Sequence, residues 1–292
     1  MTGLLTMPAS LAPLLLCLLS AVTVALANFA VKRGGDVLSA RMVLSITSAL
    51  CVLPFAFFVP FPEAALWPAI AAAITAHWVY QFFMIRALHR GDLSLVFPVM
   101  RGLAPLMTAI IAVFVLDEMP GLLGWAGLGL ATLALVIFAL PTGRSLEQKT
   151  LDQTALFWAG LTAVGIGLYS VTDAYGVRLA ENRFSFIVWL FLLDWLGTTA
   201  VAVWTRRGQL FRRLRPQLTG GIVGGVSSVI SYGAALLAFS MTEAATVTAL
   251  RETSVVFGAI LGALFLKEGF GARRVLAALI LAGGLLLLEV NF

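Results

Sequence analysis

Long apolar stretches of about 20 residues recur along the chain, separated by short polar connections. A stretch of this length crosses about 30 Å of hydrocarbon as a helix, and a helix bonds every backbone polar group within the segment. Ten spans are predicted, at about 9–31, 36–60, 65–88, 93–116, 121–140, 154–177, 184–204, 216–240, 244–266 and 271–290. The expected fold class is an all-α membrane protein with ten transmembrane helices.

The first span also has an interpretation as a secretory signal peptide. Ala25-Leu26-Ala27 resembles a cleavage site. However, a signal peptide requires a basic residue before its apolar stretch, and no lysine or arginine precedes this one. We therefore assign this span as a membrane helix.

One pattern occurs twice in the chain. An apolar helix runs from Arg101 to Glu118, and another runs from Arg251 to Glu268, 150 residues later. The chain is therefore predicted to hold two five-helix repeats, residues 1–141 and 154–292, joined by a polar linker at 142–153. Inverted repeats of this kind place a substrate site at their interface near the bilayer midplane, which indicates a transporter.

Composition supports the membrane assignment. The 292 residues are 61% hydrophobic and 11% charged, against roughly 25% charged in soluble proteins. The net charge of +5 comes from basic residues scattered over short connections, so no nucleic-acid partner is expected. The two cysteines, Cys17 and Cys51, lie in apolar stretches, without metal-ligand spacing. No metal and no cofactor are expected.

The basic residues also predict an orientation. The connections after odd-numbered spans carry 15 of the 19 lysines and arginines, namely Lys32, Arg33, Arg41, Arg86, Arg90, Arg144, Lys149, Arg206, Arg207, Arg212, Arg213, Arg215, Lys267, Arg273 and Arg274. The even-numbered connections carry only Arg178 and Arg183. The positive-inside rule then puts the odd connections in the cytoplasm and both termini in the periplasm.

Both halves resemble the EamA repeat of the drug/metabolite transporter superfamily. The resemblance rests on Asn28-Phe-Ala-Val-Lys32, Gly91-Asp92-Leu93-Ser94, Pro98 and Pro105 before Asp117-Glu118, and, in the second half, Ala238-Phe239, Thr242-Glu243-Ala244-Ala245 and Leu266-Lys-Glu268. It covers essentially the whole chain and implies a carrier with a central cavity, often an exporter of small metabolites or amino acids. Members are commonly drawn with both termini in the cytoplasm, opposite to the orientation that the charge count predicts.

Arg101 and Arg251 are the first candidate binding residues. Each lies about eight residues into its span, roughly 12 Å along a helix, where an unpaired guanidinium costs at least about 2.5–3.5 kcal/mol. One interpretation is a midplane site for a carboxylate or phosphate, to which arginine presents a planar fork. The other is a structural ion pair with Glu252 or Asp173, and each of these acids is equally a candidate for proton coupling.

Further candidates share helical faces. His77, Tyr80 and Gln81 follow i, i+3, i+4 spacing near the middle of the third span, with Trp78 beside them. They line a cavity or form an interfacial aromatic belt. The other candidate lining residues are Tyr169, Ser231, Tyr232 and Asn28. Ser231 and Tyr232 can equally bond neighbouring helices.

The predicted function is secondary active transport of an amino acid or organic carboxylate across the bacterial inner membrane, in the direction of export. The alternatives are a carrier of drugs or phosphorylated metabolites, or a channel. Enzyme motifs such as His-Glu-x-x-His and a phosphate loop are absent from the sequence, so no enzyme is predicted. The expected partners are a small-molecule substrate and membrane lipid, with the chain acting as a monomer or homodimer.

Overall fold

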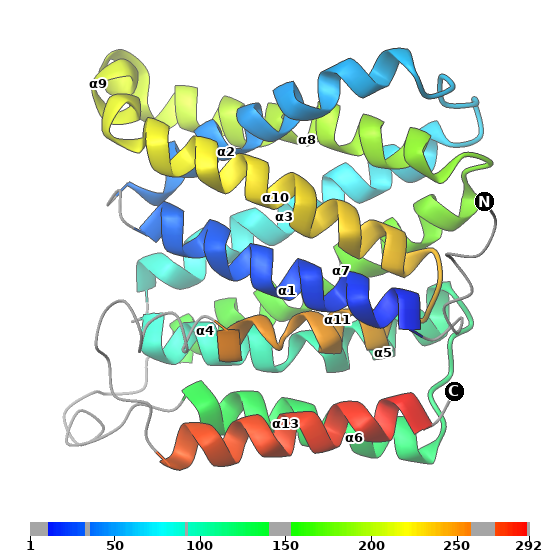
Figure 1. The fold of residues 1–292 in the computed structure, drawn as a ribbon. Coiled ribbons are helices and arrows are strands. Elements are labelled where there is room, and N and C mark those ends of the chain that lie inside the picture. The colour runs from blue at the N-terminus through cyan, green and yellow to red at the C-terminus, as the bar shows by residue number, and fades with distance from the viewer. Residues whose placement is uncertain (1–10, 33–35, 91–92, 140–152, 258–271, 291–292) are drawn as a thin grey trace, which may run out of the picture. The chain divides into compact units, whose positions relative to one another are not determined.

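The computed structural model describes residues 11–32, 36–90, 93–139, 153–257 and 272–290 (Figure 1). The longer helices are α1 (Leu11–Lys32), α2 (Val37–Val52), α3 (Trp67–Arg90), α4 (Leu93–Gly102), α5 (Ala104–Val115), α6 (Leu122–Ala139), α7 (Gln153–Leu179), α8 (Arg183–Arg206), α10 (Leu218–Phe239), α11 (Ala244–Arg251) and α13 (Ala272–Val290). Short helical turns are η1 (Leu53–Phe57), η3 (Arg207–Gln209), α9 (Leu210–Leu214) and η4 (Arg215–Gln217). The predicted all-α membrane fold is confirmed.

Several of these helices have the length and composition of membrane spans. Within the described residues, four helical stretches are long and apolar enough to cross a bilayer: Leu38–Phe57, Trp67–Ala87, Gln153–Leu179 and Arg183–Phe239. The last stretch includes α8, the short turns and α10. Shorter apolar helices cover Leu11–Ala27, Val99–Val115, Leu122–Ile137 and Val275–Leu288.

Three predicted spans are interrupted. The span predicted at 93–116 divides at Leu103 into α4 and α5. The span predicted at 244–266 stops being α-helical after Arg251, turns at 252–253 and resumes at 254–257, beyond which it lies outside the described residues. The span predicted at 36–60 changes from α-helix to the 3₁₀ helix η1 at 53–57, and Pro54 lies in the first turn of η1. Proline has no N–H to continue an α-helix, so α2 ends before it.

The helices form two compact units. Unit 1 consists of residues 1–74 and 173–242, and unit 2 consists of residues 75–172 and 243–292. Each unit therefore combines helices from the first half of the chain with helices from the second. Within unit 1, α1 packs against α10 and α2 packs against α8; within unit 2, α5 packs against α11 and α6 packs against α13.

Small residues allow the helices of unit 1 to approach closely. A Cβ on Gly225 of α10 would lie 2.8 Å from the carbonyl oxygen of Leu44 on α2. The hydroxyl of Ser48 donates to the carbonyl oxygen of Gly225 over 3.1 Å. On the other side of α10, the Ser231 hydroxyl donates to the carbonyl oxygen of Ser20 on α1 over 2.8 Å. Close backbone approach and interhelical hydroxyl bonds replace the hydrophobic effect, which does not drive helix association in lipid.

The pair α6 and α13 in unit 2 meets through glycines in the same way, and the two helices run side by side in Figure 1. A Cβ on Gly127 would lie 2.6 Å from the carbonyl oxygen of Gly284, too close for any real carbon atom. Around this contact, Ala131, Ala134, Leu135 and Leu281 form a buried cluster. The interface is therefore built on backbone contact at Gly127 and Gly284.

This contact predicts a difference between neighbouring glycines of α6. Gly127→Ala forces the two backbones apart and should lower the free energy of unfolding by about 1–3 kcal/mol. Gly129 has open space where its Cβ would lie. Gly129→Ala should therefore be neutral or stabilise by about 0.5–1 kcal/mol, because alanine favours the helix. Thermal unfolding of the purified variants in detergent measures both effects, and equal melting temperatures for the two would contradict the close packing.

Candidate functional site

Arg101 lies at a break between two helices of unit 2. It is the penultimate residue of α4, and α5 begins at Ala104. Pro105 lacks the N–H that would bond to the carbonyl of Arg101, and its ring crowds that carbonyl, which explains the break. The Arg101 side chain is at the C-terminal end of α4, where the helix dipole favours a positive charge.

Arg251 and Glu252 lie at a second break, in the other half of the chain. Arg251 is the last residue of α11, and the N–H groups of Glu252 and Thr253 bond three residues back, to Ala249 and Leu250, at 3.1 and 3.2 Å. The Thr253 hydroxyl also donates to the carbonyl of Leu250 at 2.7 Å. Such local bonds compete with the α-helical pattern and bend helices. No proline is present at this break.

The two breaks are joined by an ion pair. The Arg101 Nε lies 3.0 Å from the Glu252 Oε2. An Nη of Arg101 also donates to the Ser254 hydroxyl at 3.4 Å. Arg251 is 8% exposed and Glu252 is 1% exposed. Because Arg251 also acts electrostatically on Glu252, the cluster holds two positive charges and one negative charge in close range. Of the two structural partners predicted for Arg101, the one found is Glu252.

Aromatic rings complete this cluster. His77 stacks on Tyr169 with ring centroids 4.6 Å apart, and Tyr80 meets Tyr169 edge-on at 5.1 Å. Tyr169 is close enough to Arg101, Arg251 and Glu252 to interact with their charges. Unit 2 therefore brings together six of the residues that the sequence singled out: His77, Tyr80, Arg101, Tyr169, Arg251 and Glu252.

Two glycines of α7 explain how these rings approach one another. A Cβ on Gly165 would lie 2.9 Å from the Cα of Tyr80 on α3, and a Cβ on Gly167 would lie 3.0 Å from the backbone of Met107 and Thr108 on α5. Helices α3 and α5 can therefore both come into backbone contact with α7. Tyr169, four residues beyond Gly165, lies on the same face of α7 and contacts the rings of His77 and Tyr80 on α3.

A second polar group lies in unit 1. The Tyr232 hydroxyl donates to the carboxylate of Asp173, which is fully buried. On the preceding residue of α10, the buried Ser231 bonds to Ser20 of α1. This bond is of the interhelical kind that was the alternative for Ser231, and the Tyr232 hydroxyl likewise joins α10 to Asp173 of α7.

The remaining candidates are less defined. Gln81 is half-buried on α3, and Trp78 is 39% exposed on the same helix. Asn28 falls within α1, but its side chain lies outside what the structure describes.

Three features were not anticipated. Ser254 contacts Arg101. Glu118 accepts a 2.8 Å hydrogen bond from the N–H of Ala244, the first residue of α11.

The third feature is an open pocket of about 380 Å³ in unit 1. It is lined by Pro60, Phe61, Pro62, Glu63, Ala65, Leu66, Leu179, Ala180, Glu181, Asn182 and Ser185. There the neighbouring Glu181 raises the pKa of Glu63 above its usual value. Each of these contacts joins residues that are far apart in the sequence and belong to no periodic pattern, so the sequence did not predict them.

Comparison with known proteins places the fold. A sequence model of the EamA-like transporter family matches residues 11–140 and 153–290. Among solved structures, 29 chains match. One, described as the crystal structure of a protein, has a TM-score of 0.69 and 15% sequence identity over 95% of this chain and 96% of its own. At that identity the likeness shows the fold alone. No curated protein matches the chain.

The ion pair predicts that Arg101 and Glu252 are coupled in stability. Arg101→Met leaves a buried carboxylate without its nearest partner. It should cost about 3 kcal/mol, the lower end of the usual range, because the charge of Arg251 still acts on Glu252. The double variant Arg101→Met/Glu252→Gln removes both charges and should recover most of that loss. Thermal unfolding in detergent measures the coupling.

The exposed Arg90, at the end of α3, provides the control. Arg90→Met should change the free energy of unfolding by about 1 kcal/mol or less. If the double variant were no more stable than Arg101→Met alone, the ion pair would not be what holds Glu252 in place.

Proposed function

Because the chain belongs to the EamA-like transporter family, we propose that it is a secondary active transporter that exports an amino acid or organic carboxylate across the bacterial inner membrane. Membership supports membrane transport in general. The proposal of a carboxylate substrate comes from the chemistry of the site.

The observation that carries this proposal is that half-buried Arg101 and buried Arg251 lie at two helix breaks, with the buried Glu252 paired to Arg101 and under the electrostatic influence of Arg251. Helices interrupted within a membrane protein leave backbone groups and charged side chains that coordinate a substrate or ion in many transporters. A carboxylate from a substrate matches the fork of Arg101 in the same way that Glu252 does. We propose that the substrate takes the place of Glu252 on Arg101 while Arg251 binds the same negative group.

The aromatic rings suggest where the rest of the substrate lies. Tyr169, His77 and Tyr80 provide flat surfaces beside the charges. Such surfaces accommodate an apolar or ring-bearing body. The substrate favoured by this combination is therefore a small anion or zwitterion with an apolar side.

Replacement of Glu252 by the substrate on Arg101 would also couple substrate transport to proton movement. When a substrate carboxylate occupies Arg101, Glu252 loses its nearest cation in a buried position. Burial without a partner favours the protonated, neutral form of a carboxyl group. We propose that Glu252 takes up a proton when substrate binds, so that both leave together and the outward gradient of the substrate drives the export. Asp173, held by Tyr232, is a second candidate for proton movement.

Transport by the purified protein tests this function. A thermal-shift screen against amino acids, carboxylates, phosphates and cationic drugs selects the ligand, and proteoliposomes loaded with it should show saturable counterflow. A channel would give flux without counterflow. Arg251→Lys keeps the charge but loses the planar fork. It should therefore weaken substrate binding by roughly tenfold to a hundredfold, the range for a hydrogen bond to a charged group.

Two matched variants complete this test. Arg90→Lys is the control, since Arg90 is exposed and outside the cluster. Arg101→Met/Glu252→Gln should be folded and inactive. A folded double variant with normal counterflow would show that the substrate binds elsewhere.

We also propose that both termini lie in the periplasm. Beyond the 15 to 2 distribution of basic residues, the two ends of the packed helices α2 and α8 differ in charge. Asp36 before α2 pairs with Arg206 at the end of α8. At the opposite ends, Glu63 follows α2 and Glu181 precedes α8, beside the rings of Phe61, Trp67 and Trp189. The arginine-rich end is the one expected in the cytoplasm.

Reporter fusions after Phe292 test this orientation. An alkaline phosphatase fused there should be active, because it folds in the periplasm, and a fluorescent protein that matures only in the cytoplasm should be dark. The reverse pattern would place the termini in the cytoplasm.

A further inference from the structure

The connection between α8 and α10 is the most basic part of the described chain. Residues 204–217, named here the basic connector, contain five arginines and no acidic residue: Arg206, Arg207, Arg212, Arg213 and Arg215. It contains η3, α9 and η4, and both α9 and η4 pack against α2. The basic connector is therefore a folded part of unit 1.

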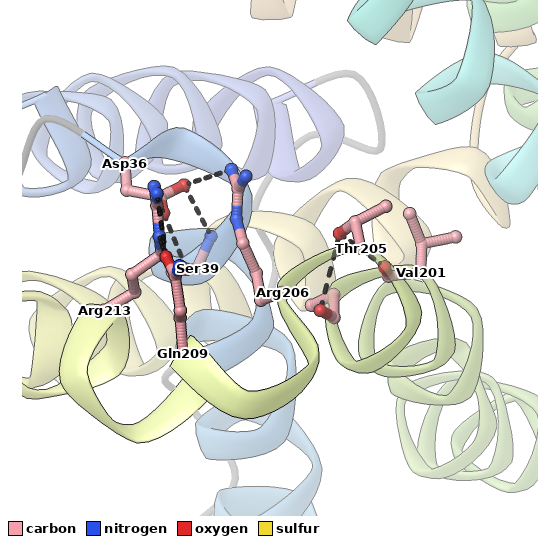
Figure 2. Close-up of polar contacts among 8 residues, drawn as sticks. Asp36, Ser39, Val201, Thr205, Arg206, Gln209 and Arg213 are labelled. Carbon is pink, nitrogen blue, oxygen red and sulfur yellow. Dashed lines mark hydrogen bonds and ion pairs between the residues drawn. The ribbon is translucent and has the colours of Figure 1, made fainter.

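Asp36 holds the basic connector in place. As Figure 2 shows, Arg206 and Arg213 converge on this carboxylate, at 3.0 and 3.6 Å. Asp36 also caps α2 by accepting bonds from the N–H and hydroxyl of Ser39. Partial burial acts to raise the pKa of Asp36, but the bonds from Ser39 and the contact with Arg206 outweigh it and lower the pKa below its usual value. Asp36 is therefore ionised at neutral pH and keeps both arginines bound.

Three arginines of the basic connector are left facing outward. Arg207, Arg212 and Arg215 are exposed, and within the described residues the ion pairs of this segment use Arg206 and Arg213. Counting Asp36, the basic connector has an excess of four positive charges. Two exposed rings accompany them, Trp204 at 71% and Phe211 at 88%.

The position of the basic connector identifies what these groups meet. It joins the ends of two apolar helices within a stretch long enough to cross a bilayer. Its level is therefore that of the lipid headgroups. Exposed aromatic rings are typical of that layer, and arginine side chains there are attracted to anionic lipids. A soluble anion would account for the arginines but not for Trp204 and Phe211.

We propose that the basic connector binds the phosphate groups of anionic phospholipids, with Arg207, Arg212 and Arg215 as the phosphate ligands and Trp204 and Phe211 inserted beside them. The guanidinium fork matches two oxygens of one phosphate. This site is separate from the arginine cluster of unit 2 and does not depend on the proposed substrate. Lipid bound here would stabilise unit 1 by mass action, because the unfolded chain lacks the folded connector.

Titration of the full chain in neutral detergent tests the proposal. Short-chain phosphatidylglycerol should bind and raise the melting temperature, whereas phosphatidylcholine of the same chain length should have little effect. Arg212→Ala/Arg215→Ala should weaken phosphatidylglycerol binding roughly thirtyfold, from about fivefold for each arginine near an anionic surface. Both positions are exposed, so the variant should unfold at the wild-type temperature without lipid.

Two controls decide between a built site and general attraction. Arg86→Ala/Arg90→Ala removes two exposed arginines elsewhere and should leave phosphatidylglycerol affinity nearly unchanged. An equal loss in both double variants would mean that net charge alone attracts the lipid, which would overturn the proposal. Inorganic phosphate alone should raise the melting temperature far less than phosphatidylglycerol. If the two were equally effective, the site would be one for soluble anions and the proposal would be wrong.

Discussion

Hydrocarbon offers no hydrogen-bond partner to a charge or to a free backbone group, and the arrangement of unit 2 follows from that constraint. Arg101 and Arg251 lie where α4 and α11 end, so each break and each charge must be compensated inside the protein. Glu252 compensates Arg101 at 3.0 Å, and Ser254 adds a hydroxyl. The helix ends place their partial negative charge beside the guanidinium groups. The same arrangement keeps charged and polar groups together inside an apolar unit, which is the basis of the anion site proposed above.

Close packing is the second requirement, because helices in lipid gain no hydrophobic energy from meeting. Gly127 with Gly284, Gly225 with α2, and Gly165 with Tyr80 each bring two backbones into contact. In the arginine cluster this has a consequence for the site, since Gly165 lets α3 approach α7, where His77 and Tyr80 contact Tyr169. The rings and charges are therefore positioned by residues that have no side chain.

The sequence was informative about elements and less so about partners. Apolar stretches gave the helices, and the repeat placed Arg101 and Arg251 at equivalent positions. The break after Arg101 could have been read from Pro105, whereas that after Arg251 depends on the hydroxyl of Thr253 and has no such marker. Helical periodicity gives the face on which a residue lies, but the helix that it meets depends on the tertiary fold. For that reason Glu252 and Asp173 were equal candidates for Arg101 until the structure paired Asp173 with Tyr232. The same holds for the single contacts made by Ser20, Ser254 and Glu118, because each partner comes from a helix distant in the sequence.

The arginines of this chain fall into two classes that differ in what surrounds them. In unit 2, Arg101 and Arg251 lie in a cluster with one carboxylate and tyrosines, and Glu252 compensates one of the two positive charges, so Arg101 binds another anion only by exchange with Glu252. In the basic connector, one carboxylate, Asp36, holds two arginines, and the others are exposed. Their charge is thus available to the surface layer without exchange. In the functions proposed for the two groups, arginine beside a competing carboxylate selects a substrate and exposed arginine attaches to lipid, so its surroundings determine the role of the same side chain.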